Sequence, residues 1–211
     1  VAVGYNALAV NVSSNFNVAV GSQALYSNKA ANNTALGHHS LYSNTTGSNN
    51  TAGGYASLDA NTTGVDNTAF GMSALTSNNG GDFNVAMGYS SLRDNTDASR
   101  NVAVGSYALE LQSFANAGTG YATNNTAVGY SALINNDPAN ITANTSGKGN
   151  TAVGGFALNT NSTGFYNTAI GFNSDVSTAT LSNATSVGYL ASANASNKVR
   201  LGNTAVTVIE G

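Results

Sequence analysis

Acidic residues and two histidines are the side chains of this sequence that could carry out chemistry. The acids are Asp59, Asp66, Asp82, Asp94, Asp97, Asp137, Asp175, Glu110 and Glu210, and the histidines are the adjacent pair His38 and His39. Catalysis needs such groups to converge in a cleft. Nearly all the acids instead lie in linkers between repeated segments, and none recurs at a fixed repeat position. The sequence therefore predicts a protein that is not an enzyme, with no catalytic residues and no cofactor.

Two groups of these residues could ligate a metal ion. Asp94 and Asp97, in "RDNTDASR", could hold calcium, but no Gly-Gly-x-Gly-x-Asp repeat supports this, and a solvated turn is the preferred interpretation. Adjacent strand residues point to opposite faces, so His38 and His39 of one chain are not expected to chelate one ion. One histidine from each of three chains could meet on an axis, but surface histidines are the simpler interpretation. We predict no metal site.

The composition excludes several classes of partner. The 211 residues are 41% hydrophobic and only 7% charged, with a net charge of −3, 24 glycines, one proline and no cysteine. Hydrophobic content with little net charge favours order over disorder. Six Lys and Arg residues cannot form a phosphate-binding stripe, so no nucleic-acid partner is expected. No apolar run approaches the roughly 20 residues that span a bilayer, so no membrane insertion is expected.

One segment is repeated along the whole chain. It has the form Asn-(Thr/Val)-Ala-apolar-Gly-x-x-(Ala/Ser)-Leu, as in "FNVAVGSQAL" at 16–25 and "NNTAVGYSAL" at 124–133. Most invariant glycines are 17 residues apart, and two spacings of 24 and 25 residues come from insertions at 110–124 and 134–149. Short β-branched segments bounded by turn-forming residues predict strands. We expect a repeat array over 1–192 and a degenerate closing segment over 193–211.

Side-chain alternation assigns the columns of the repeat to two faces. The residues before and after the central alanine share one face, which we assign to the interior together with a leucine column. The predicted core is Val20, Leu25, Leu36, Leu41, Phe70, Leu75, Met87, Leu92, Val104, Leu109, Val128, Leu133, Val153, Leu158 and Ile170.

An alanine column lies on the opposite face: Ala19, Ala35, Ala52, Ala69, Ala86, Ala103, Ala127, Ala152 and Ala169. A column without larger residues implies that something packs closely against it, unless alanine was merely copied by duplication. We expect Ala103→Leu to disrupt association between chains and Ala98→Leu, in a linker, to be tolerated.

Asparagine opens nearly every segment: Asn17, Asn33, Asn50, Asn67, Asn84, Asn101, Asn125, Asn150 and Asn167. Stacked at about 4.8 Å, these amides can hydrogen-bond from coil to coil. The glycine column is expected to supply a backbone conformation or close approach that a side chain would block.

These features predict an all-β fold, a parallel β-roll or β-solenoid of about 12 coils and mostly 17 residues per coil. Twelve coils give a rod about 50–60 Å long. So thin a coil was expected to cover only one face internally, leaving the alanine face as an apolar stripe. A homotrimer, intertwined or side by side, would cover that stripe.

The repeated units "NTAVGYSAL" resemble the head repeats of trimeric autotransporter adhesins, in a longer form similar to units in phage tail fibres and bacterial surface proteins. The resemblance covers nearly the whole chain and implies a left-handed parallel β-roll, a trimer and binding to host surfaces. The unit departs from that family in being mostly 17 residues long and in lacking a neck or stalk. The segment "NKVRLGNTAVTVIEG" is similar to closing strands before a self-cleaving chaperone domain of phage fibres.

Aromatic residues and the insertions supply the candidate ligand surface. Several aromatics follow the invariant glycine, where they could stack on sugars or instead shield seams between coils or chains. The candidate ligand surface is Tyr107, Phe114, Tyr121, Tyr130, Ile141, Phe165 and Tyr166.

The sequence favours a non-enzymatic trimeric attachment module that binds a cell-surface glycan or protein, located extracellularly on a virion tail fibre or bacterial surface. A structural filament, ice binding and a glycan depolymerase are the alternatives.

Overall fold

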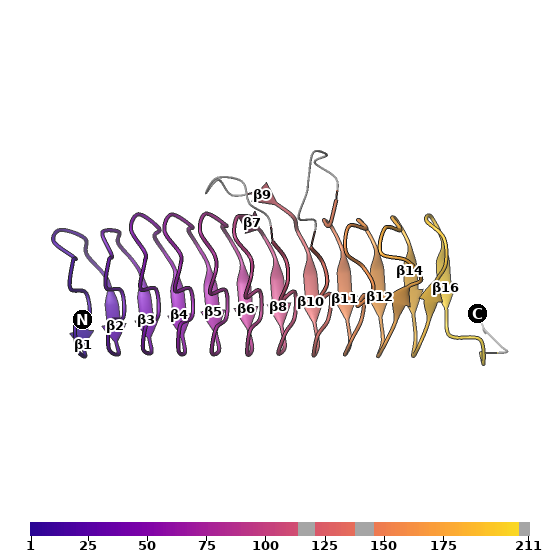
Figure 1. Cartoon of the computed structure of the whole chain (residues 1–211), viewed down its shortest axis with the longest axis horizontal. Coiled ribbons are helices and arrows are strands. Elements are labelled where there is room, and N and C mark those ends of the chain that lie inside the picture. Colours follow the sequence, from indigo (N-terminus) through magenta and orange to yellow (C-terminus); the bar gives the residue numbers. More distant parts are fainter. Residues whose placement is uncertain (114–120, 138–145, 207–211) are drawn as a thin grey trace.

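The chain folds as a rod of stacked coils. A computed structural model describes residues 1–113, 121–137 and 146–206. Within these residues every helix-or-strand element is a β-strand, and successive coils lie side by side with β1 and β16 at opposite ends of the rod (Figure 1). This is a parallel β-solenoid, and most of its coils are 17 residues long, as predicted.

One strand from each coil contributes to a parallel sheet of 12 strands that runs the length of the rod. Its strands are β1 (Ala2–Val3), β2 (Val18–Val20), β3 (Thr34–Leu36), β4 (Thr51–Gly53), β5 (Thr68–Phe70), β6 (Val85–Met87), β8 (Val102–Val104), β10 (Thr126–Val128), β11 (Thr151–Val153), β12 (Thr168–Ile170), β14 (Thr185–Val187) and β16 (Val199–Leu201). Two small sheets pair β7 (Ala98–Ser99) with β9 (Tyr121–Ala122) and β13 (Asp175–Val176) with β15 (Ser192–Ala193).

The register of the main sheet aligns the repeat columns. Each central alanine pairs with the next, as Ala19 does with Ala35 and Ala127 with Ala152, across both insertions. Because coils stack without slip, every column of the sequence becomes a straight row on the rod. The row continues to β16, which pairs with β14 and extends the main sheet beyond residue 192.

The alanine column lies inside the coil, so the predicted assignment of the two strand faces is wrong. Every alanine of that column from Ala19 to Ala169 is buried, whereas the residues on either side of it point outward. Predicted core residues that are exposed or only half-buried are Val20, Leu36, Phe70, Met87, Val104, Val128, Val153 and Ile170. The threonines of the same strands share this outer face. Side chains do alternate between the two faces along each strand, as predicted, but the interior has room only for a methyl group at this position.

The leucine column fills the rest of the interior. Leu25, Leu41, Leu75, Leu92, Leu109, Leu133 and Leu158 are fully buried. They form one continuous cluster with the inward alanines. Each coil thus buries one large side chain against small ones, and a single chain closes its own interior. The close packing inferred for alanine comes from the coil itself and not from a second chain.

These leucines occupy the left-handed region of backbone conformation. Leu75 has φ 54° and Leu133 φ 55°, and the other leucines of the column are similar. This region costs an L-residue about 1–2 kcal/mol and is worst for side chains branched at Cβ. The column therefore contains leucine, which branches one carbon further out, and no valine or isoleucine.

Buried asparagines form the predicted ladder from coil to coil. The Oδ1 of Asn50 accepts the backbone N–H of Asn67 at 3.0 Å, and the Oδ1 of Asn67 accepts that of Asn84 at 3.0 Å. The Nδ2 of Asn67 donates to Gly81 O at 2.8 Å. Each amide thus satisfies buried backbone groups on a neighbouring turn, which would otherwise cost about 1–3 kcal/mol each.

A second buried amide ladder was not predicted. The Nδ2 of Asn61 donates to Asn44 at 2.8 Å, and that of Asn78 donates to Asn61 at 2.7 Å. In the first extended coil the longer Gln112 takes this position, donating to Asn95 at 3.2 Å and accepting from Asn136 at 3.0 Å. The signal in the sequence is an amide three residues after each leucine, which was interpreted only as turn chemistry.

The invariant glycines are required by both backbone conformation and space. Gly105 has φ 131°, and a Cβ there would lie 2.5 Å from the carbonyl oxygen of Gly129 in the next coil. Any side chain in this column would therefore push adjacent coils apart.

Substitution of the leucine column tests the left-handed backbone. We expect Leu75→Ile to lower the free energy of unfolding by about 2–3 kcal/mol, because Cβ branching adds backbone strain to the repacking cost. Leu75→Met keeps an unbranched Cβ and should cost less than about 1.5 kcal/mol. Urea unfolding of both variants measures the difference, and equal losses would contradict this account.

Substitution of the alanine column tests the corrected faces. Ala103→Leu should destabilise the single chain by about 1–3 kcal/mol through overpacking, whereas Val104→Leu on the outer face should be nearly neutral. Ala98 is itself buried in β7, so it is not the tolerant site that the sequence predicted. Thermal unfolding at several protein concentrations separates a folding defect from an assembly defect. Equal tolerance at positions 103 and 104 would contradict the corrected faces.

Candidate binding surfaces

The outer face of the main sheet carries an apolar stripe along the rod. We define the outer stripe as Val20, Leu36, Phe70, Met87, Val104, Val128, Val153 and Ile170. Leu36 is 56% exposed and Phe70 43%. The stripe forms because the interior accepts only alanine at the middle of each strand, so the larger neighbours must face outward. Soluble monomers rarely expose apolar patches larger than a few hundred Å², so the outer stripe is a candidate interface.

A second surface is a continuous row of aromatic rings, which we define as the aromatic row: Tyr89, Tyr107, Tyr130, Phe156, Phe172 and Tyr189. Neighbouring ring centroids along the row are 5.1, 5.8, 5.2, 5.9 and 6.2 Å apart. The first four contacts are edge-to-face, a favourable arrangement for aromatic pairs.

Two positions of the repeat build the aromatic row. Tyr89, Tyr130, Phe172 and Tyr189 directly follow the invariant glycine and are exposed. Tyr107 and Phe156 lie one residue later, with φ 61° and 57°, and are half-buried between them. Alternating exposed and half-buried rings therefore form one surface on consecutive coils.

The structure brings together only part of the predicted ligand surface. Tyr107 and Tyr130 are neighbours in the aromatic row. Tyr121 lies in β9, beside β7. The ring centroids of Phe165 and Tyr166 are 5.4 Å apart, and this pair lies outside the row. Phe114 and Ile141 lie outside the described residues.

Phe156 was missed by sequence reasoning. It shares its position in the repeat with Tyr107, two residues after the invariant glycine, and this shared position was the available signal.

The histidine pair lies in a second group of stacked rings near the first coils. The ring centroids of His38 and His39 are 4.2 Å apart and the rings are nearly parallel. Their predicted placement on opposite faces is wrong, because they follow Gly37 in a turn where His39 has φ 58°. His38 also stacks on Tyr55, and His39 on Tyr42. Across the described ranges no cluster of three His, Cys, Asp or Glu side chains could hold a metal ion.

An ion cluster lies beside the first rings of the aromatic row. Arg93 donates to both carboxylate oxygens of Asp94, at 2.9 and 2.8 Å, and also pairs with Glu110. Burial raises the pKa of Glu110, while Arg93 opposes that shift. Arg93 lies four residues after Tyr89 and Glu110 three residues after Tyr107, so the cluster belongs to the coils of the first two rings of the row.

Asp97 directly precedes β7. It is buried, and it accepts a hydrogen bond from the backbone N–H of Gly80 at 3.2 Å. The solvated turn predicted around Asp94 and Asp97 is therefore wrong for Asp97, whose burial follows from its place directly before β7.

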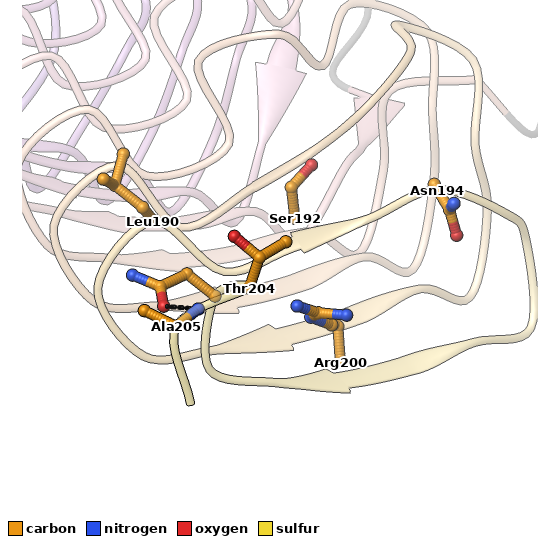
Figure 2. A pocket seen from close by; sticks show the side chains of 7 residues that line it. Leu190, Ser192, Asn194, Arg200, Thr204 and Ala205 are labelled. Atoms are coloured by element: carbon orange, nitrogen blue, oxygen red, sulfur yellow. Dashed lines mark hydrogen bonds between the residues drawn. The ribbon is translucent and has the colours of Figure 1, made fainter. Parts of the chain in front are cut away.

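An open depression lies at the C-terminal end of the rod (Figure 2). Arg200, on β16, occupies the position that alanine holds in other coils and donates to Gly202 O at 2.7 Å. The remaining lining residues are Leu190, Ser192, Asn194, Asn203, Thr204 and Ala205. The described lining offers the guanidinium of Arg200 together with hydroxyl and amide groups.

Comparisons with known proteins do not place the chain: no protein-family model, curated protein or solved structure matches it. Within the part of the chain that the structure describes, no helix has the length and apolar character needed to cross a bilayer.

Asp175, in β13, holds the position of the leucine column. Its partly buried carboxyl group allows a test of how burial of a titratable group affects stability. It accepts hydrogen bonds from the backbone N–H of Thr160 at 3.0 Å, from Thr160 Oγ1 at 2.8 Å and from Val176 N at 2.8 Å. Burial raises its pKa above the ordinary 3.8, and these hydrogen bonds lower it in smaller measure. The folded state thus binds this proton more tightly than the unfolded chain does.

The contribution of Asp175 to stability is therefore greatest at low pH and is lost as pH rises from about 3.8 through the folded pKa. We expect Asp175→Asn to reduce this fall in unfolding free energy. Thr160→Val removes one hydrogen bond to the carboxylate and should move the fall to higher pH. Thermal unfolding between pH 3.5 and 7 checks both, and identical slopes in all three proteins would contradict the assignment.

Proposed function

We propose that this chain is a non-enzymatic module of an extracellular attachment fibre, assembled as a homotrimer with the outer stripes of three rods packed together. The observation that carries the proposal is the outer stripe itself. It is apolar, lies in straight register and runs from β2 to β12, eight strand spacings or about 40 Å, with a gap at Gly53. Packing it against identical copies removes it from water, and a closed cyclic arrangement leaves no copy of the stripe uncovered.

The character of the strands supports self-association over a variable partner. The outer stripe recurs at every strand of the main sheet from β2 to β12 except β4, where Gly53 holds the position, so a second identical rod offers the same spacing along the interface. The neighbouring outward positions are threonine or valine, which add no charge that packing would have to desolvate. Matching rods can therefore align coil by coil.

The resemblance to adhesin and phage-fibre repeats supports the attachment role. Three parallel rods present each exposed surface three times, and repeated coils present it several times along one rod. Such multiplicity raises avidity for a cell-surface glycan or protein without stronger individual contacts. The terminal segment "NKVRLGNTAVTVIEG" favours a phage tail fibre over a bacterial adhesin within this proposal.

A structural filament is the second candidate. Among the described residues β1 and β16 are the outermost strands of the main sheet, and a filament would form if rods paired end to end through strand edges. Such edges can template pairing with another chain. A filament would grow with concentration, whereas a closed trimer would not.

Mass in solution tests the trimer directly. Light scattering should give three times the chain mass of 21.1 kDa. The double variant Val128→Glu with Ile170→Glu places charges on the outer stripe and should shift the protein to monomer, because these charges would be buried without partners. Thr178→Glu, in the exposed connection after β13, is the matched control and should leave the mass unchanged.

Two results would overturn the proposal. A folded wild-type monomer would remove the trimer, and mass that grows without limit would favour the filament. Circular dichroism would reveal a double variant that has lost its β-sheet structure. In that case the milder Val153→Thr with Val128→Thr, which keeps the shape of the stripe, should weaken the trimer in a concentration-dependent way.

A further inference from the structure

We infer that the aromatic row is a binding track for a linear, neutral, β-linked polysaccharide, whose successive sugar rings stack along the rod axis. This deepens the proposed attachment function by naming the ligand class and the surface that takes it. The inference rests on that function for its biological setting, but the track itself is complete within one chain.

The first observation is the shape of the track. The row runs from the coil of β6 to that of β14, five strand spacings of about 4.8 Å, or about 24 Å in length. An extended chain of β-linked pyranoses advances by a similar distance per sugar. The spacing of the rings therefore allows a straight chain to meet a ring surface at each coil, as bases do on the stacking platforms of single-strand binders.

The second observation is the exposure of apolar ring surface. Tyr130 is 52% exposed and Phe172 is 50% exposed, while Tyr107 and Phe156 pack edge-on against them. The edge-on contacts hold neighbouring rings in fixed orientations, so little freedom is lost when a ligand binds. The apolar faces of pyranose rings suit such rigid surfaces.

The third observation is the nature of the polar groups nearby. Arg93 and Asp94 lie in the coil of Tyr89, and Glu110 lies in the coil of Tyr107, at one end of the row; the side chains of Arg93 and Asp94 are partly exposed. These groups can donate to and accept from sugar hydroxyls. Arg93 is already paired with both acids, and the chain carries a net charge of −3. A neutral glycan fits this surface better than a polyanionic one.

The alternative occupant is another copy of the chain, because the row lies next to the outer stripe. The two differ in their consequences. If the rings seal a seam between rods, removing them lowers the mass in solution, and the row is then not the glycan track. If they form the track, removing them lowers glycan affinity while the mass stays the same.

The test is affinity electrophoresis through gels that contain soluble neutral β-linked polysaccharides (hydroxyethyl cellulose, glucomannan or galactomannan), with alginate as the charged comparison. Wild-type protein should be retarded by at least one neutral polymer more than by alginate. Tyr130→Ala and Phe172→Ala should each lower affinity by about 2- to 10-fold, and Tyr130→Phe should retain it. Tyr166→Ala removes an exposed ring outside the row and should have no effect.

Each result separates the two proposals. No retardation by any neutral polymer overturns the track while a measured trimer leaves the proposed function standing. Glycan binding by a monomer supports the track and overturns the trimer. Reduced mass in Tyr130→Ala and Phe172→Ala, or equal loss of affinity in Tyr166→Ala, overturns the assignment of the row. Circular dichroism of each variant confirms that the fold persists.

Discussion

The rod depends on one constraint, the need to satisfy polar groups that are buried between coils. A thin coil has little apolar interior, so backbone amides that face inward cannot be left without partners. The two amide ladders meet this need, because each Asn amide both donates and accepts. Asn67, for example, accepts a backbone N–H from the next coil and donates to Gly81 O. The same bonds require each coil to stack in one register, so the amides set both stability and alignment.

This register also explains how the fold tolerates insertions. The sequence carries insertions at 110–124 and 134–149, yet Ala103 pairs with Ala127 and Ala127 with Ala152 in the same register as in the other coils. The second ladder continues through Gln112, which donates to Asn95 and accepts from Asn136. The hydrogen bonds that hold successive coils together are made by the residues of the repeat columns. Extra residues are therefore tolerated wherever they do not interrupt a column.

Much of the fold could be predicted from the sequence, because identical spacing, strand-forming segments and a glycine column leave few alternatives. Which face of each strand points into the coil could not be predicted. A pattern of large-small-large residues normally places the large ones inside, and Val20 and Leu36 were assigned on that basis. The decisive quantity is the width of the interior, which depends on where Leu25 and Leu41 project from a left-handed backbone. Their positive φ cannot be seen in a sequence, because leucine rarely adopts it.

The candidate surfaces follow from the same narrow interior. In the regular coils the strand interior holds alanine and the turn interior holds leucine, so the larger apolar side chains on either side of the alanine face solvent or a partner. Inward columns are therefore uniform, while outward positions such as those of Tyr107, Phe156 and His39 are free to vary from coil to coil. Tyr107 and Tyr130 could be found from the sequence by their residue type, but their contact with Phe156 could not. That contact can be predicted only if one knows that the first and second positions after the glycine place their rings in the same row. The scaffold fixes the spacing between coils and leaves the outward positions free to vary. A substitution at one outward position therefore changes one site in a series of evenly spaced sites along the rod. That property suits recognition of ligands that are themselves periodic.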